Sequence, residues 1–248
     1  MDTLIILHGW QSSKEKWQRV KKFLETQSLK VVVPDLPGFK LENQLDKPWN
    51  LDNYVEWLSS ILKNTNDFPG QVFLLGHSFG GRVAVKFAVK YPEKLKGLIL
   101  VAAAGIKKKK TIWDRILLAV IKLTRKLGVE ETTFEKTPWH ILRKLFYRYF
   151  LRKTDYLNAT ARQKEIMKSA LEDDLKPLLE TISTKTLIIW GKKDKATLLK
   201  DGRLMNDKIK NSRLEILENI GHTPHLENPA LLSQKIKTFI VESENNLL

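Results

Sequence analysis

The stretch Gly76-His77-Ser78-Phe79-Gly80 decides the fold class of this 248-residue chain. It follows an apolar run at 72–75, which we expect to be a buried strand, and it precedes residues 81–90, which have helical spacing. A G-x-S-x-G sequence at such a junction is typical of a nucleophile elbow, a sharp turn that exposes a serine hydroxyl. Both glycines are needed because a side chain at either position would collide with neighbouring backbone. The pattern predicts that Ser78 is a nucleophile.

Short apolar runs alternate with helical patterns on both sides of this motif. Apolar runs without polar alternation, separated by helices, are typical of a parallel sheet covered on both faces. We therefore predict an α/β fold with a mostly parallel, six-stranded sheet. The expected strands are 3–7, 31–33, 72–75, 98–102, 186–190 and 214–217, and the expected helices of this core are 14–25, 51–62, 81–90, 197–206 and 230–241.

The alternation of strands and helices stops between residues 105 and 184. In this segment apolar residues recur at helical spacing over 112–127 and 139–150, which predicts two amphipathic helices. We predict an α/β core formed by residues 1–104 and 185–248, interrupted by an all-helical insertion at 105–184.

A serine nucleophile needs a base that takes its proton. Among the five histidines, His222 follows the last predicted strand, on a loop that can reach the carboxyl end of the sheet. His225 is the rival candidate, which we interpret as structural. Asp194 follows the preceding predicted strand and is the carboxylate expected to orient the imidazole. The order Ser78, Asp194, His222 along the chain is the one expected of the fold in which a G-x-S-x-G elbow carries the nucleophile.

These segments together resemble the α/β-hydrolase superfamily, in its capped, esterase-like branch. The resemblance implies that the insertion 105–184 is a helical cap. The resemblance is carried by residues 4–10, 34–38, 76–82, 190–194 and 221–229. It implies that Ser78 is the nucleophile, Asp194 the acid and His222 the base. It also implies an oxyanion hole formed by the backbone N–H groups of Trp10 and Phe79, which lie on the two elements able to supply such donors.

The N-terminus departs from the family pattern. The family usually has a β-hairpin before the first of these segments, whereas here that strand begins almost at Met1. We therefore expect a sheet that is shortened at the N-terminus. The sheet edge left in this way could be covered, open or paired in a dimer.

Candidate substrate-binding residues are fewer and less specific. Arg82, in the first turn after the elbow, could bind a substrate carboxylate, and the alternative is a structural ion pair. Trp139, Phe146 and Tyr149 form an aromatic stripe in the insertion, and we expect them to line an apolar acyl pocket. The sequence contains no metal-ligand cluster, no phosphate-cradling glycine loop and no dinucleotide fingerprint, so we predict neither a cofactor nor a metal.

Composition limits the partners and the compartment. The formal net charge is +15, but the basic residues are mostly scattered lysines, which favour a solvated surface over a nucleic-acid site. The lysine run 107–110 leaves contact with a membrane surface as an alternative. The chain has no cysteine, which excludes disulfides and thiolate metal sites. With no signal sequence and no apolar run long enough to span a membrane, we predict a cytoplasmic protein.

The predicted function is that of a cofactor-independent serine hydrolase. We expect it to cleave carboxylic esters through an acyl-enzyme, with lactones or thioesters as related substrates for a carboxylesterase or lactonase. A second hypothesis is a C–C bond hydrolase or lyase on a keto acid, for which Arg82 would be the anchor. A third is a hydrolase-fold ligand receptor with little turnover, and a fourth is a basic protein that binds membranes or nucleic acid.

Overall fold

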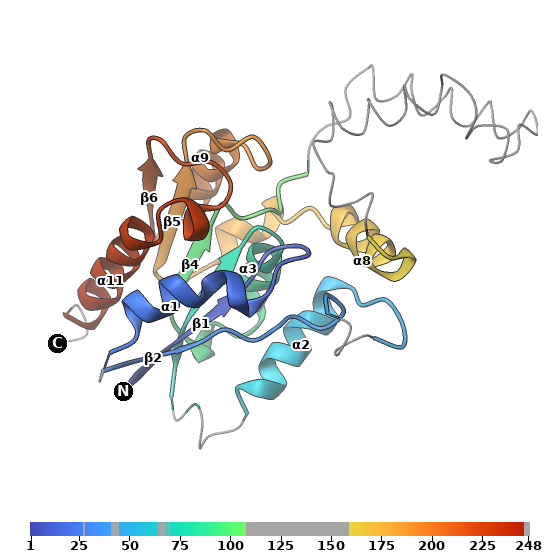
Figure 1. Cartoon of the computed structure of the whole chain (residues 1–248), viewed down its shortest axis with the longest axis horizontal. Coiled ribbons are helices and arrows are strands. Elements are labelled where there is room, and N and C mark those ends of the chain that lie inside the picture. The colour runs from blue at the N-terminus through green and yellow to red at the C-terminus, as the bar shows by residue number, and fades with distance from the viewer. Residues whose placement is uncertain (27, 41–44, 64–67, 69, 108–158, 246–248) are drawn as a thin grey trace, which may run out of the picture. The chain divides into compact units, whose positions relative to one another are not determined.

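In the described part of the chain, a six-stranded parallel sheet forms the core of the fold (Figure 1). The computed structural model describes residues 1–248 except 27, 41–44, 64–67, 69, 108–158 and 246–248. The strands are β1 (Asp2–Leu7), β2 (Leu29–Val32), β3 (Val72–His77), β4 (Leu95–Val101), β5 (Thr186–Gly191) and β6 (Ser212–Leu217). Their order across the sheet is β2-β1-β3-β4-β5-β6, and every neighbouring pair is parallel. The predicted α/β class and its parallel sheet are confirmed.

The helices of the core lie close to the ranges that periodicity predicts. The α-helices in the described ranges are α1 (Gln18–Leu24), α2 (Leu51–Ile61), α3 (Phe79–Lys90), α8 (Ala161–Glu172), α9 (Leu199–Lys208), α10 (Pro224–Glu227) and α11 (Pro229–Asn245), and the 3-10 turns are η1 (Lys14–Trp17), η3 (Pro92–Lys94) and η4 (Lys176–Thr181). The helix expected over 14–25 is thus divided into η1 and α1. The short helix α10 was not predicted, because four residues are too few to show a helical period. The helices expected at 112–127 and 139–150 lie outside the described residues.

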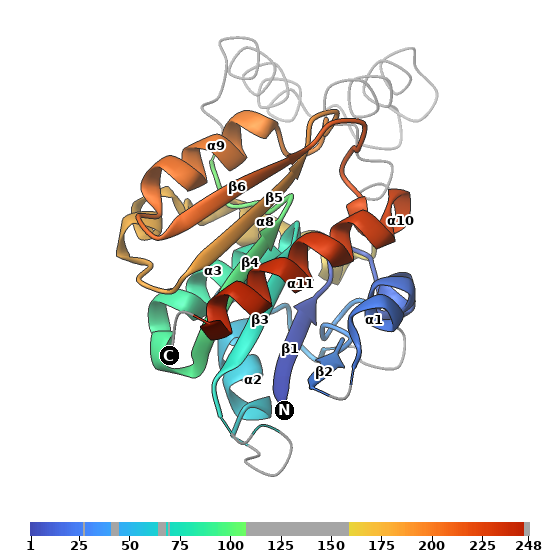
Figure 2. The same ribbon diagram turned by 90° about the vertical axis from the view of Figure 1, so that its left-hand side faces the viewer.

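Alternate side chains of each strand enter two different apolar layers, because successive side chains of a strand point to opposite faces of the sheet. Leu4 and Ile6 of β1 pack in the layer that includes α1 and α11, which lie together on one face (Figure 2). Ile5 and Leu7 pack in the other layer, which includes α2, α3 and α9. Strands buried on both faces need apolar residues at every position, and this is why their runs show no alternation.

The compact unit that contains the sheet comprises residues 1–107 and 160–248. Residues 105–107 and 160–184, which lie within the predicted insertion, therefore group with the sheet. The helix α8 buries Ile166, Met167 and Ala170, so its apolar face contributes to this unit. A helical cap over the site stays a prediction, since residues 108–158 lie outside the described part of the chain.

Candidate active site

Ser78 occupies a strained turn between β3 and α3. Its backbone angles are φ 52° and ψ −111°, a conformation that residues with a side chain rarely adopt. A Cβ atom at Gly76 would lie 2.5 Å from the carbonyl oxygen of Gly80, and one at Gly80 would lie 2.2 Å from that of Leu7. Both distances are far below van der Waals contact, so the requirement for glycine on either side of the serine is met for the reason predicted.

Neighbouring backbone holds this turn in place. The N–H of Ser78 donates to the carbonyl of Val101 at 3.2 Å, and its own carbonyl accepts from Gly81 and Ala104, each at 3.0 Å. A residue in such a backbone conformation costs about 1–3 kcal/mol and persists only where surrounding contacts fix it. These three hydrogen bonds supply that constraint and keep the serine at the carboxyl edge of the sheet.

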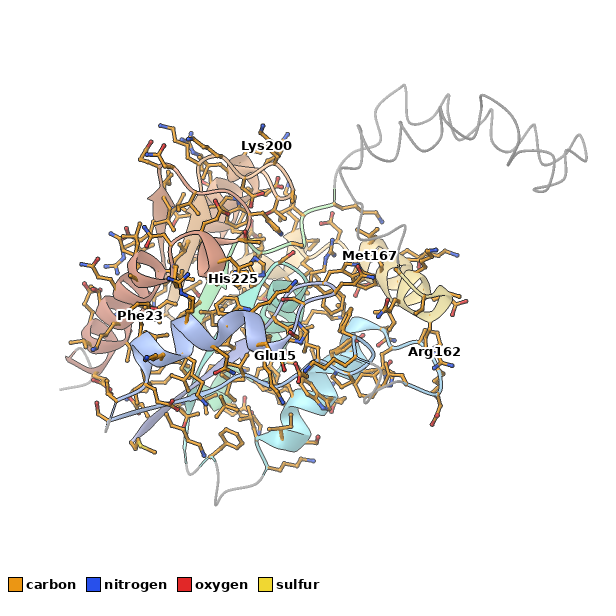
Figure 3. The ribbon with its side chains drawn as sticks, viewed as in Figure 1. Glu15, Phe23, Arg162, Met167, Lys200 and His225 are labelled. Carbon is orange, nitrogen blue, oxygen red and sulfur yellow. The ribbon has the colours of Figure 1, made fainter. Side chains whose placement is uncertain are left out.

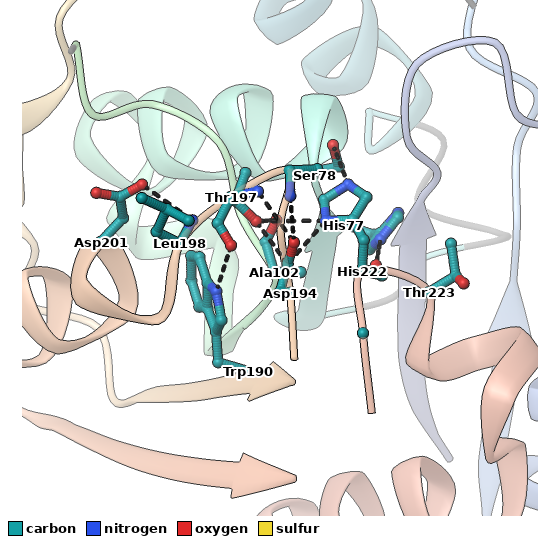
Figure 4. A network of polar contacts seen from close by, with 12 residues as sticks. His77, Ser78, Ala102, Trp190, Asp194, Thr197, Leu198, Asp201, His222 and Thr223 are labelled. Carbon is teal, nitrogen blue, oxygen red and sulfur yellow. Dashed lines mark hydrogen bonds and ion pairs between the residues drawn. The ribbon is translucent and has the colours of Figure 1, made fainter. Parts of the chain in front are cut away.

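The structure brings the three predicted side chains together at this edge (Figure 4). The Nε2 atom of His222 lies 3.1 Å from the Oγ atom of Ser78, and its Nδ1 atom lies 2.8 Å from the Oδ2 atom of Asp194. The three residues follow β3, β5 and β6, and parallel strands end at one edge of their sheet. Distances of this size allow a hydrogen-bonded relay from hydroxyl to imidazole to carboxylate.

Asp194 is buried and is held by hydrogen bonds from the backbone. Its side chain has no exposed surface. Its Oδ1 atom accepts from the backbone N–H groups of Ala196 at 2.8 Å and Thr197 at 3.0 Å, so the buried charge is compensated. Because an ionised carboxylate only accepts hydrogen bonds, Nδ1 of His222 is the donor to Oδ2. Nε2 is then free to accept the proton of Ser78.

Thr197 is a further member of this network, and it was not predicted from the sequence. Its Oγ1 atom lies 2.8 Å from Oδ2 of Asp194, 3.3 Å from Nδ1 of His222 and 3.1 Å from the carbonyl oxygen of Ala102. The signal was present in the sequence, because an Asp often accepts from the backbone two and three residues later in an Asx turn. Such a turn places residue 197 beside the carboxylate.

The two residues expected to form the oxyanion hole lie on the elbow helix and on the loop after β1. Phe79 is the first residue of α3, where a backbone N–H has no carbonyl one turn earlier to bond within the helix. Trp10 follows β1, and its ring lies 6.0 Å from that of Phe79. Between β1 and Trp10, a Cβ atom added to Gly9 would lie 3.3 Å from Cβ of Ser78, so the glycine allows this loop to approach the elbow closely.

A group of buried aromatic rings lies beside the catalytic edge. His225 of α10, which Figure 3 labels, stacks on Trp17 of η1 with ring centroids 4.3 Å apart and planes 3° from parallel. The ring of His77 lies 4.7 Å from that of His225, and its Nε2 atom lies 2.8 Å from the carbonyl oxygen of His222. The pKa of His225 is lowered to about 3, mainly because the ring is buried and to a smaller extent because His222 lies nearby. Burial likewise holds the pKa of His77 well below its ordinary value.

Because His225 is buried and neutral, we expect the free energy of unfolding to decrease in mild acid. In the unfolded chain His225 takes up a proton near the ordinary histidine pKa of 6.5, whereas in the folded protein it stays neutral down to a pKa of about 3. The unfolded state therefore binds more protons between these values, so stability is complete above pH 6.5 and falls as the pH falls through this window. For His225 alone, lowering the pH from 7 to 5 should reduce the free energy of unfolding by about 2 kcal/mol.

Urea unfolding at both pH values measures this effect. The variant His225→Phe keeps an aromatic ring for Trp17 to stack on but cannot titrate, so its pH dependence should be smaller than that of the wild type by the same amount. Equal pH dependence in the two proteins would contradict the assignment of a depressed pKa to His225.

Comparison with known proteins identifies the family of this chain. The family model described as "alpha/beta hydrolase fold" matches residues 2–229, which is most of the chain. The chain belongs to the alpha/beta hydrolase family. The matched range contains Ser78, Asp194 and His222.

Individual relatives of this α/β hydrolase include enzymes whose names refer to lipids. The human monoacylglycerol lipase ABHD6 is 26% identical over 267 residues, which cover 98% of this chain and 76% of that protein. Lipase 3 of Moraxella sp. (strain TA144) is 25% identical over 249 residues, with coverage of 91% and 73%. The crystal structure of lip1 from Acinetobacter baumannii AYE is 26% identical and has a TM-score of 0.69. The match covers 99% of this chain and 85% of that chain. Family and relatives support a hydrolase.

The remaining candidate residues of the α/β hydrolase do not join the triad in the described structure. Arg82 is buried, and its Nη1 atom donates to the carbonyl oxygens of Ala170 at 2.6 Å and Asp173 at 3.3 Å. These bonds tie α3 to the C-terminal end of α8 through backbone carbonyls and not through the ion pair given as the structural alternative. Substrate binding by Arg82 stays a prediction. Trp139, Phe146 and Tyr149 lie outside the described residues, and their role stays a prediction.

Metal-binding clusters and membrane-spanning helices are both absent from the described ranges of the α/β hydrolase. Within them, no group of three or more His, Cys, Asp or Glu side chains could hold a metal ion. In those same ranges, none of the helices combines the length and apolar character needed to cross a lipid bilayer.

Proposed function

We propose that this α/β hydrolase cleaves carboxylic esters, with Ser78 as nucleophile, His222 as general base and Asp194 as the acid that orients it. One observation carries the proposal: the three side chains form one chain of hydrogen bonds. Oγ of Ser78 lies 3.1 Å from Nε2 of His222, and Nδ1 of His222 lies 2.8 Å from Oδ2 of Asp194. The lipase relatives favour an acyl ester as the substrate class. The proposal requires no cofactor.

The first half of the reaction transfers the acyl group to the enzyme. His222 takes the proton of Ser78 at Nε2 as Oγ forms a bond to the ester carbonyl carbon. The carbonyl π electrons move to oxygen and give a tetrahedral intermediate. When this collapses, the bond to the alcohol oxygen breaks, and the imidazolium of His222 returns the proton to the departing alcohol. An acyl-enzyme on Ser78 remains.

The second half regenerates the serine. A water molecule attacks the acyl carbonyl while Nε2 of His222 takes a proton from it. Collapse of the second tetrahedral intermediate breaks the bond to Oγ, which recovers its proton from the imidazolium. Asp194 stabilises the positive imidazolium in both halves without itself becoming protonated.

Two backbone donors would stabilise the oxyanion in each tetrahedral intermediate. The N–H groups of Phe79 and Trp10 belong to the elbow helix and to the loop after β1, the two segments that approach Ser78. A preorganised donor of this kind contributes about 3 kcal/mol to transition-state stabilisation. The same arrangement accepts lactones and thioesters, because these also present an acyl carbonyl to the serine.

The keto-acid alternative has less support than ester hydrolysis. It depends on Arg82 as an anchor for a substrate carboxylate, and the structure shows this guanidinium bound to backbone carbonyls of α8. The acyl pocket under a helical cap stays part of the proposal, to be tested through the length of the acyl chain that the enzyme accepts.

The test combines active-site labelling with a substrate series. The protein is treated with a fluorophosphonate, which reacts with activated serines, and the modified peptide is identified by mass spectrometry. We expect one adduct, on Ser78. p-Nitrophenyl esters from acetate to palmitate, with matching lactones and thioesters, then give the chain-length preference, and pre-steady-state traces should show a burst from acyl-enzyme formation.

Three results would contradict the proposal. No turnover of any ester, lactone or thioester together with turnover of a vinylogous keto acid would favour C–C bond hydrolysis. Thermal stabilisation by an ester without repeated turnover would favour a ligand receptor. A fluorophosphonate adduct on a serine other than Ser78 would show that the nucleophile lies elsewhere.

A further inference from the structure

The loop that carries His222 is held by side chains that bond one backbone group of each of three consecutive residues, 221–223. The N–H of Gly221 donates to Oε2 of Glu227 at 2.7 Å, and the N–H of Thr223 donates to Oε1 at 2.9 Å. Between them, the carbonyl oxygen of His222 lies 2.8 Å from Nε2 of His77. Since a carbonyl oxygen only accepts, Nε2 of His77 is the donor. The backbone of the catalytic histidine is thus fixed on both sides.

We propose that Glu227 is a positioning residue for the general base. Its carboxylate fixes the backbone before and after His222 and thereby sets the distance from Nε2 to the hydroxyl of Ser78. The proposal rests on the proposed function, because it assigns Glu227 a role in the reaction that His222 performs. Glu227 does not contact the reacting atoms and acts only through the loop.

The short helix α10 directs this carboxylate back toward the loop. The N–H groups of Leu226 and Glu227 both donate to the carbonyl of Thr223 at 2.9 Å, which closes the turn. The hydroxyl of Thr223 donates to Oε1 of Glu227 at 3.0 Å, which is the third bond to this carboxylate. The turn and the three bonds form a closed unit in which the side chain at the end of α10 binds the residues that precede it.

An ionised carboxylate suits this task because each of its oxygens accepts hydrogen bonds and neither donates. Partial burial tends to raise the pKa of Glu227, but the bonds from Gly221 and Thr223 outweigh this and lower it below its usual value. Glutamine has a single carbonyl oxygen, and its NH₂ group would face one of the two backbone donors. Replacing Glu227 with Gln therefore removes the bond to one of the two backbone N–H groups, while the size of the side chain stays nearly the same.

Glycine at position 221 allows the carboxylate to approach. A Cβ atom added there would lie 3.2 Å from Oε1 and 3.3 Å from Oε2 of Glu227, so a larger residue would press against the carboxylate.

The contact between His222 and Ser78 is sensitive to small displacements. Nε2 lies 3.1 Å from Oγ, and a shift of a few tenths of an ångström would break this hydrogen bond. Misplacement of a catalytic group by about 1 Å costs on the order of 100-fold in rate.

Kinetics of two variants test the proposal. For an ester that the wild type hydrolyses, Glu227→Ala should lower kcat by about 10- to 100-fold with little change in KM, because the acyl pocket is not touched. Glu227→Gln should show a smaller decrease. Glu218→Gln is the matched control: Glu218 lies nearby in the chain, is 67% exposed, and pairs with Lys192 at 2.7 Å. Its kcat should equal that of the wild type.

A spectroscopic measurement makes the test independent of ester hydrolysis. The proton between Nδ1 of His222 and Asp194 should give a low-field NMR resonance in the wild type, and Glu227→Ala should broaden or shift it while Glu218→Gln leaves it unchanged. If the wild type hydrolyses no ester, the proposed function fails, but this comparison still tests whether Glu227 positions the imidazole.

The outcomes separate positioning from a general effect on folding. Rates are normalised to the folded fraction, determined by thermal unfolding, and Glu227→Gln replaces the alanine variant if the latter does not fold. An unchanged kcat per folded molecule together with an unchanged low-field resonance overturns the proposal. A loss of activity that matches the loss of folded protein also overturns it.

Discussion

Replacing Ser78 with alanine is expected to reduce kcat for ester hydrolysis by about a million-fold, the size of effect found when a serine nucleophile is removed from a triad. The remaining rate comes from oxyanion stabilisation and substrate binding alone. The reason is geometric: Oγ is the atom that lies 3.1 Å from Nε2 of His222, and alanine leaves the imidazole with no hydroxyl to activate.

The fold should survive this change. The backbone bonds of residue 78 to Val101, Gly81 and Ala104 do not involve its side chain. We therefore expect the free energy of unfolding of Ser78→Ala to stay within about 1 kcal/mol of the wild type. Steady-state kinetics, fluorophosphonate labelling and urea unfolding are measured in parallel.

Ser60→Ala supplies the matched control for the nucleophile. Ser60 is an exposed serine on α2, and its hydroxyl donates to the carbonyl of Trp57 in the same helix at 2.7 Å. Its removal should leave kcat and labelling unchanged. If Ser78→Ala retained more than a small fraction of wild-type kcat, or were still labelled in full, Ser78 would not be the nucleophile.

The second large effect is expected from Gly191→Ala, at the end of β5. A Cβ atom at this position would lie 2.2 Å from the carbonyl oxygen of Gly221 and 2.4 Å from that of Ile220. Both obstacles are backbone atoms, so neither can move aside by a change of rotamer. The loop that carries His222 must shift away from the strand that leads to Asp194. We expect a loss of about 3 kcal/mol in the free energy of unfolding.

The same shift should lower activity, because it acts on the contact between the acid and the base. A displacement approaching 1 Å predicts a decrease in kcat of about 100-fold in the protein that remains folded. Urea unfolding gives the stability, and kinetics normalised to labelled active sites give kcat.

Gly70→Ala controls for the general effect of replacing glycine. A Cβ atom at Gly70 would have nothing within 4 Å, so its stability should change by less than about 1 kcal/mol and its kcat should not change. If Gly191→Ala kept the stability and activity of the wild type, the end of β5 and the loop that carries His222 would not be in such close contact.

The sequence by itself determined the sheet and the order of the site residues. Apolar runs at every strand position follow from burial on both faces, and the glycines beside Ser78 follow from backbone contact, so both are visible in the amino-acid types. Asp194 and His222 could be selected because each follows a predicted strand, and parallel strands place their carboxyl ends at one edge. Element bounds differ by a few residues, since periodicity does not define where a helix begins.

Only the tertiary structure decided which polar groups bind one another. Thr197, Glu227 and His77 act through contacts with backbone and side chains whose positions depend on how loops from different strands meet. The partners of Arg82 could not be assigned from the sequence, because a cation in the first turn of a helix suits a substrate carboxylate as well as a structural ion pair. The carbonyl of Ala170 that Arg82 bonds lies 88 residues further along the chain. Local periodicity and composition report burial and backbone conformation, whereas distances between separate loops arise only when the whole sheet has formed.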